Sequence, residues 1–139
     1  MVAGEGARVW RLAGGAAVAA VLLCSAARAQ DGLFGSRGHF AETDGAAIYR
    51  YVCAGCHMPD GRGAEGAGRY PALAGDARLE NPSYPIGMVL RGRGAMPPFQ
   101  RLLTDEQIAA VIGYVRQNFG NEYGAPPSVG EVQIVREQQ

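Results

Sequence analysis

Two cysteines and a histidine are the residues with the clearest chemistry in this sequence. Cys53 and Cys56 are separated by two residues, and His57 follows directly. On a turn of helix, two thiols at this spacing can each add to one vinyl group of the same porphyrin, and the adjacent imidazole then falls under the iron. The pattern therefore predicts the covalent attachment of one haem c, with His57 as an axial ligand of the iron.

The cysteine pair has three other interpretations: a structural disulfide, a redox dithiol and half of a zinc site. A thioredoxin-like dithiol opens a helix after a buried strand. Here a helical stretch over 44–52 is predicted to lead into the pair, and a Gly-rich loop to follow it. A zinc site needs more ligands, yet beyond residue 29 the chain has no further Cys and, besides His57, only His39. Haem attachment is the favoured interpretation.

A methionine is expected to supply the second axial ligand. The candidates beyond residue 29 are Met58, Met88 and Met96. Met58 adjoins the histidine and cannot easily reach the opposite face of a haem. Met88 falls in a helix predicted over 82–91, where it is expected to fill a gap or lie at the surface. Met96 stands in a loop stiffened by Gly and Pro and is preferred, with Met88, His39 or an open site as alternatives.

The choice of a thioether bears on function. A neutral thioether favours ferrous over ferric iron, so it raises the reduction potential relative to a second imidazole. A filled sixth position also excludes oxygen and peroxide from the iron. Ligation by Met96 therefore favours electron transfer over catalysis.

Four segments of the chain resemble a monohaem class I cytochrome c, in the order found in that family. They are the haem motif with Gly45 and Tyr49 before it, segment 70–75, segment 92–99 and a closing helix over 104–119. The resemblance covers about residues 44–119. It implies an all-α fold in which three to five short helices wrap around the covalently attached haem, with the N-terminal and C-terminal helices crossed near Gly45.

The resemblance also implies roles for individual residues. The backbone carbonyl of Pro71 is expected to accept a hydrogen bond from His57, and Leu73 to pack on the porphyrin. Met96 occupies the position of the second axial ligand. The family often has a Trp hydrogen-bonded to a haem propionate, and because the chain has no Trp beyond residue 29, a Tyr or an Arg is expected to take that role.

Helix signals are strongest near the C-terminus. Thr104 and Gln107 form a capping box before an apolar stripe of helical period, and Gly120 marks the stop. The stripe consists of Ile108, Val111, Ile112, Val115 and Phe119, and it is expected to be core. Ser128 and Glu131 form a second capping box, which predicts one short terminal helix packed on the domain.

The first 29 residues have the order of a secretory signal peptide. Arg8 and Arg11 precede an uncharged stretch over 12–27, and small residues end the segment. Cleavage is expected after Ala29, which gives a periplasmic protein; a retained anchor and a lipoprotein at Cys24 are the alternatives. The rest divides into an N-terminal extension over 30–42, a cytochrome domain over 43–120 and a tail over 121–139.

The charge balance of the mature chain argues against two classes of partner. Beyond residue 29 there are ten Arg, no Lys and twelve Asp plus Glu. A net acidic chain of this kind fits neither a nucleic-acid binder nor a polybasic membrane-surface protein. The longest apolar run in this part, 108–115, is too short to cross a bilayer.

The function expected from the sequence is one-electron transfer by a low-spin His/Met haem c. The protein would relay electrons between a periplasmic dehydrogenase or other donor and a respiratory acceptor, with an oxidase or another cytochrome as further possible partners. Arg91 and Arg93 are expected near the exposed haem edge, either as a patch that steers an acidic partner or as plain solvated charge. The alternatives are a cytochrome subunit permanently bound to a periplasmic oxidoreductase and, less favoured, a haem sensor or peroxidase with an open iron.

Overall fold

The computed structural model describes residues 40–66 and 68–138. The predicted signal peptide, its cleavage site after Ala29 and the alternative ligand His39 lie outside the described residues. So does most of the predicted N-terminal extension. In the part of the chain that is described, every helix is too short or too polar to cross a membrane.

The helix that carries the haem motif is longer than predicted and is not uniform. It begins as α2 (Gly45–Ile48), widens into the π-helical segment η1 (Tyr49–Cys53) and ends as α3 (Ala54–His57). Asp44 caps its start, because its carboxylate accepts a hydrogen bond of 2.8 Å from the backbone of Ala47. The cysteine pair therefore lies on the last turns of a helix, as the chemistry of the motif requires.

Helix α4 (Ser83–Arg91) follows the short 3₁₀ helix η2 (Ala77–Leu79). The predicted start is off by one residue: Pro82 is the N-cap, and Asn81 accepts a hydrogen bond of 3.0 Å from the backbone of Ser83. Ile86 and Leu90 are fully buried. Both belong to the hydrophobic core.

Helix α5 (Asp105–Gln117) has the predicted capping box of Thr104 and Gln107. The Gln107 side chain is buried and also donates hydrogen bonds of 2.6 Å to the carbonyls of Phe40 and Glu42. Phe40, predicted as part of an extension, is itself a member of the hydrophobic core. The chain upstream of α2 is thus fastened to α5.

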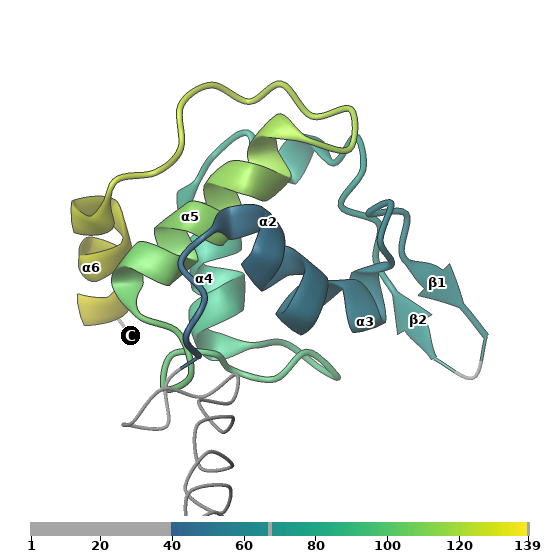
Figure 1. The fold of residues 1–139 in the computed structure, drawn as a ribbon, viewed down its shortest axis with the longest axis horizontal. Coiled ribbons are helices and arrows are strands. Elements are labelled where there is room, and N and C mark those ends of the chain that lie inside the picture. The colour runs from purple at the N-terminus through teal and green to yellow at the C-terminus, as the bar shows by residue number, and fades with distance from the viewer. Residues whose placement is uncertain (1–39, 67, 139) are drawn as a thin grey trace, which may run out of the picture. The chain divides into compact units, whose positions relative to one another are not determined.

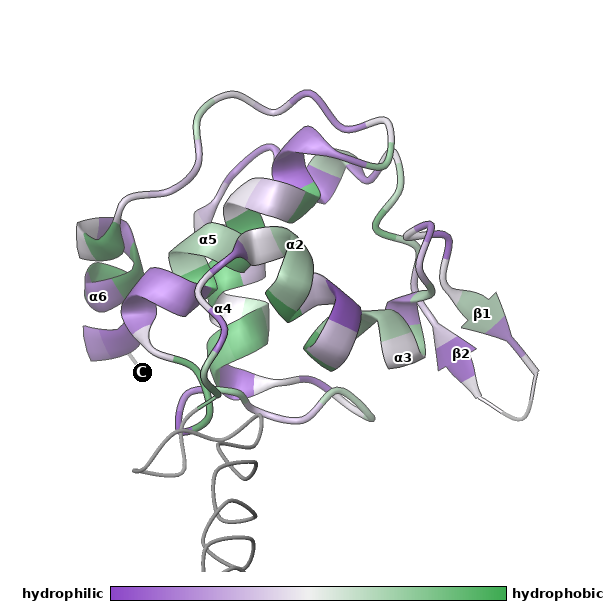
Figure 2. Cartoon of the chain, viewed as in Figure 1, coloured by the Kyte–Doolittle hydropathy of each residue, from purple (hydrophilic) through white to green (hydrophobic). Residues whose placement is uncertain are grey.

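The predicted terminal helix is present as α6 (Val129–Glu137), with the capping box of Ser128 and Glu131. It packs against α4 and α5 (Figure 1). Val132 and Val135 are buried, and Arg136 forms an ion pair of 2.6 Å with Asp105 at the start of α5. Each of these three helices carries hydrophobic stretches (Figure 2).

Two short strands interrupt the helical pattern. Strands β1 (Ala64–Glu65) and β2 (Arg69–Tyr70) pair antiparallel, with Ala64 opposite Tyr70. The sequence predicted only a Gly-rich loop here. All other named elements in the described part of the chain are helices, which confirms the all-α prediction.

Helices α2 and α5 cross in close contact, as the resemblance implied (Figure 1). A Cβ atom at Gly45 would overlap the carbonyl oxygen of Ala110 and lie 2.9 Å from its carbonyl carbon. Beside the crossing, the ring of Tyr49 packs on the rings of Tyr114 and Phe119, with centroids 5.6 and 4.8 Å away. The absence of a side chain at Gly45 is what allows the two backbones to approach.

Candidate functional site

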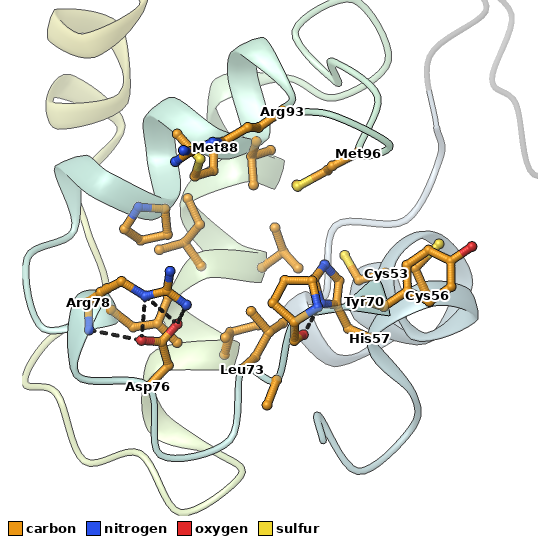
Figure 3. A pocket seen from close by; sticks show the side chains of 18 of the residues that line it. Cys53, Cys56, His57, Tyr70, Leu73, Asp76, Arg78, Met88, Arg93 and Met96 are labelled. Carbon is orange, nitrogen blue, oxygen red and sulfur yellow. Dashed lines mark hydrogen bonds and ion pairs between the residues drawn. The ribbon is translucent and has the colours of Figure 1, made fainter. Parts of the chain in front are cut away.

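A cavity of about 390 Å³ lies between the motif helix, α4, α5 and the loops that connect them (Figure 3). Most of the side chains on its wall are apolar, and they come from three helices and two loops. They include Val52, Leu73, Val89, Phe99, Val111, Ile112 and Val115. The predicted stripe of α5 is therefore partly core and partly cavity wall.

His57 lines this cavity at the end of α3. Its Nδ1 is 2.9 Å from the carbonyl oxygen of Pro71, the acceptor that the resemblance implied. Because a carbonyl only accepts, Nδ1 donates the proton in this contact, and Nε2 is left as the nitrogen available to a metal. An imidazole oriented in this way is suited to bind a metal through Nε2.

A glycine brings Pro71 to the histidine. The backbone of Gly63 donates a hydrogen bond of 3.0 Å to the carbonyl of His57. Gly63 has a φ of +67°, and a Cβ there would overlap the carbonyl oxygen of Tyr70 and lie 2.7 Å from the carbonyl carbon of Pro71. Only glycine fits this approach, so the Gly-rich loop serves to place the segment that orients His57.

Met96 lines the cavity from a different element than His57 (Figure 3). Its loop is closed by two backbone hydrogen bonds of 3.0 Å between Arg93 and Met96. Met88 of α4 also lines the cavity, which corrects its prediction as a gap-filling or surface residue, whereas Met58 does not lie on the cavity wall. Two thioethers thus face the space into which His57 projects.

The two thiols lie near one another at one side of the cavity (Figure 3). Cys53 is half-buried, Cys56 is exposed, and both are free. Burial, with a smaller contribution from Cys56, raises the pKa of the Cys53 thiol to about 12. The Tyr49 hydroxyl donates a hydrogen bond of 2.7 Å to the carbonyl of Met58 and so fixes the end of the motif.

These residues fit a haem c. The site combines an apolar cavity, two free thiols, an imidazole with a free lone pair and a thioether on a separate loop. Soft thioether and imidazole donors are the ligands that low-spin haem iron takes in cytochromes c. A mostly helical fold that brings such a donor set to one cavity defines a cytochrome c.

The comparison with protein families agrees with that class. Residues 40–115 match the family described as "Cytochrome C oxidase, cbb3-type, subunit III". The match covers more than half of the chain, and the chain belongs to this family of c-type cytochromes. It is accordingly an electron-transfer protein with covalently bound haem c.

Three similar proteins illustrate the range of its relatives. The cytochrome subunit of fructose dehydrogenase from Gluconobacter japonicus is 42% identical over 94 residues, which cover 57% of this chain and 19% of that subunit. The cytochrome c subunit of the quinone alcohol dehydrogenase from Gluconacetobacter polyoxogenes is 31% identical over 112 residues, which cover 71% of this chain and 23% of that subunit. Cytochrome c-552 of Thermus thermophilus is 36% identical over 98 residues, which cover 58% of this chain and 64% of that protein. The chain spans about a fifth of the length of the two dehydrogenase subunits.

Several polar residues at the cavity were not predicted. Asp76, Arg78 and Arg116 line it, and Asn121 supports its wall by donating hydrogen bonds to the carbonyls of Leu73 and Val115. A signal for Arg116 does exist, because it follows Ile112 by four residues and so belongs to the buried stripe of α5. Of the two arginines expected near the haem edge, Arg93 lines the cavity and Arg91 does not.

Asp76 and Arg78 form an ion pair that makes stability depend on pH. The hydrogen bonds from the Arg78 side chain hold the pKa of Asp76 below its ordinary value of 3.8. The pair therefore stabilises the fold above about pH 4, and this contribution is lost as the pH falls through the lowered pKa. We expect Asp76→Asn to be less stable than the wild type at neutral pH and to lose less stability on acidification, measured by urea unfolding at a series of pH values.

The control removes a similar ion pair at the surface. Asp60 lies 3.7 Å from Arg62, and its side chain is 60% exposed. Asp60→Asn should change the free energy of unfolding little, because exposed pairs contribute little. If Asp76→Asn lost stability in parallel with the wild type on acidification, the ion pair would not be the cause of the pH dependence.

Proposed function

We propose that this protein transfers single electrons through one haem c attached to Cys53 and Cys56, with His57 and Met96 as axial ligands of a low-spin iron. The observation that carries the proposal is that His57, held with Nε2 free, and Met96, held by a separate loop, line one apolar cavity. When bound, the haem supplies an iron centre that gains and loses one electron.

Each residue of the site has a distinct part in this function. Pro71 holds the ring of His57 in one orientation, so the ligand needs little rearrangement when the iron changes its charge. Met96 favours the ferrous state through its neutral thioether. Leu73 and Ile112 belong to the apolar wall that excludes water. A site of this kind is suited to rapid one-electron exchange rather than to chemistry on a substrate.

The partner we propose is a dehydrogenase in the periplasm, from which the chain accepts electrons and passes them to a respiratory acceptor. The names of the relatives support this partner, because two of them are cytochrome subunits of a fructose and an alcohol dehydrogenase. The same names favour the second candidate, a subunit bound permanently to its oxidoreductase. Export is supported by the order of residues 1–29, in which Arg8 and Arg11 precede an apolar stretch.

The test uses the holoprotein expressed in a host that matures c-type cytochromes. Haem should remain with the polypeptide after denaturation, the oxidised form should show a sulfur-to-iron charge-transfer band, and the reduced form should bind carbon monoxide only slowly at neutral pH. Rapid binding of carbon monoxide by the wild type would overturn the His/Met assignment. Purification from the native periplasm separates the two candidates, because only a permanent subunit co-purifies with a dehydrogenase in fixed proportion.

A further inference from the structure

One buried amide joins the segment that orients His57 to the end of α5. Asn121 is 2% exposed. Its Nδ2 donates hydrogen bonds of 2.9 Å to the carbonyl of Leu73 and 2.8 Å to the carbonyl of Val115. Leu73 and Val115 both line the cavity. A single side chain therefore connects two parts of the cavity wall that are far apart in the sequence.

A specific turn brings Asn121 back to the end of α5. Phe119 and Gly120 both have a left-handed backbone, with φ of +61° and +78°. The backbone of Asn121 closes the turn by donating a hydrogen bond of 3.0 Å to the carbonyl of Asn118. A positive φ is uncommon for a residue with a side chain. Val115 belongs to the last turn of α5, where carbonyls lack a partner within the helix, and Asn121 supplies one.

The backbone around Leu73 also holds the acceptor of the histidine. Leu73 donates a hydrogen bond of 2.7 Å to the carbonyl of Gly61, in the loop after the haem motif. Pro71, two residues earlier in the chain, accepts the hydrogen bond of 2.9 Å from His57 Nδ1. Because Pro71 and Leu73 belong to one short stretch of backbone, a bond that fixes the Leu73 carbonyl also limits the movement of the Pro71 carbonyl. Asn121 is thus linked to His57 without touching it.

The two hydrogen bonds use only the donor end of the Asn121 amide. Its Oδ1 is buried and accepts no hydrogen bond from a residue that the structure describes. A side chain of similar size without N–H donors would fill the same position and lose both bonds. Leucine is such a side chain, so it separates the hydrogen bonds from the packing.

We propose that Asn121 is a positioning residue for the axial ligand His57, because it ties the segment that carries the Pro71 carbonyl to α5. The inference rests on the proposed function, in which His57 binds the haem iron. A hydrogen bond from Nδ1 keeps the imidazole in one orientation and raises the basicity of the nitrogen that binds the metal. Asn121 lies beyond residue 115, where the family match ends. The segment over 121–139, predicted as a tail, thus supports the iron site.

The experiment replaces Asn121 by leucine in the holoprotein and uses NMR. In the ferric form the haem methyl resonances respond to the orientation of the axial imidazole, and we expect them to shift. In the ferrous form, without urea, the His57 Nδ1 proton should exchange with deuterium about tenfold faster, the factor that corresponds to loss of one hydrogen bond of ordinary strength. A merely structural role would lower the urea midpoint but leave the haem resonances of the folded protein in place.

The matched control is Asn118→Leu, the same change in the same turn. Asn118 is exposed, and its Nδ2 donates a hydrogen bond of 2.8 Å to the carbonyl of Tyr114 in α5. It makes no hydrogen bond to the segment that carries Pro71. Asn118→Leu should therefore leave the haem methyl resonances and the exchange of the Nδ1 proton unchanged.

A measurement on the wild type tests the proposal even if Asn121→Leu yields no holoprotein. The Nδ1 proton of His57 and the side-chain amide protons of Asn121 should show the same dependence of exchange on urea, because both sets of bonds open in one local event. Different dependences would overturn the proposal.

The proposal is also overturned if Asn121→Leu leaves the haem methyl resonances and the Nδ1 exchange as in the wild type, or if Asn118→Leu changes them by as much. These outcomes differ from a failure of the proposed function. In that case the wild type itself would lack covalent haem or the sulfur-to-iron charge-transfer band.

Discussion

Replacement of Met96 by alanine is expected to abolish the sulfur-to-iron charge-transfer band completely and to make the reduced protein bind carbon monoxide rapidly at neutral pH. The loop that carries Met96 is closed by its backbone hydrogen bonds to Arg93, so removal of the side chain leaves the loop in place and takes away only the thioether. The reduction potential should fall in the same variant, because the ferrous state loses its soft ligand. Optical spectroscopy, carbon monoxide mixing and redox titration measure the three effects.

The matched control is Met88→Ala, because Met88 lines the same cavity from α4. It should retain the charge-transfer band and slow binding of carbon monoxide. If the band persisted in Met96→Ala and disappeared in Met88→Ala, the second axial ligand would be Met88. If both variants kept it, neither methionine would be the ligand.

Substitution of Gly45 is expected to have the largest effect on stability. A Cβ at this position meets the backbone of Ala110 and comes within 3.0 Å of the Tyr114 Cβ. Neither atom can move without shifting α5, so Gly45→Ala should lower the free energy of unfolding by about 3 kcal/mol. The loss expected for alanine is already a large part of the roughly 5–15 kcal/mol that holds a domain folded. Valine is larger, so Gly45→Val should leave no stable holoprotein. Urea unfolding and the yield of holoprotein measure the two outcomes.

Gly130→Ala provides the control within a helix. A Cβ at Gly130 has only an ordinary contact, 3.9 Å from the Ser128 hydroxyl. The substitution should stabilise α6 by about 0.5–1 kcal/mol, because alanine favours the helix over glycine. Stability of Gly45→Ala equal to that of the wild type would show that the α2 and α5 backbones do not meet as closely as described.

The features that could be predicted from sequence are those encoded within a few residues. The spacing of Cys53, Cys56 and His57 and the capping boxes at Thr104 and Ser128 are local patterns, and the structure contains both capping boxes where they were predicted. The mostly helical fold follows from such signals together with the resemblance. The π-helical widening of η1 has no comparable signal, because it depends on how the motif helix packs.

What could not be predicted depends on which way a side chain faces in the folded protein. Met88 was assigned to a gap or to the surface, since the helical period alone does not say which structure lies beside α4. Asp76 and Arg78 are ordinary loop residues in the sequence, and only the folded chain brings them to the cavity. The β hairpin was missed because each of its strands has two residues, too few for an alternating pattern.

The hydrogen bonds of Arg116 connect the stretch of chain between α5 and α6 to the segment after η2. Figure 1 shows this stretch without helix or strand, yet Arg116 donates to the carbonyl of Ala125 within it as well as to Leu79 and Glu80. If the stretch detached, a buried guanidinium would lose a partner, at a cost of about 1–3 kcal/mol. The connection to α6 and the segment after η2 are thus linked through one side chain, and they should open as a single cooperative unit rather than fray independently.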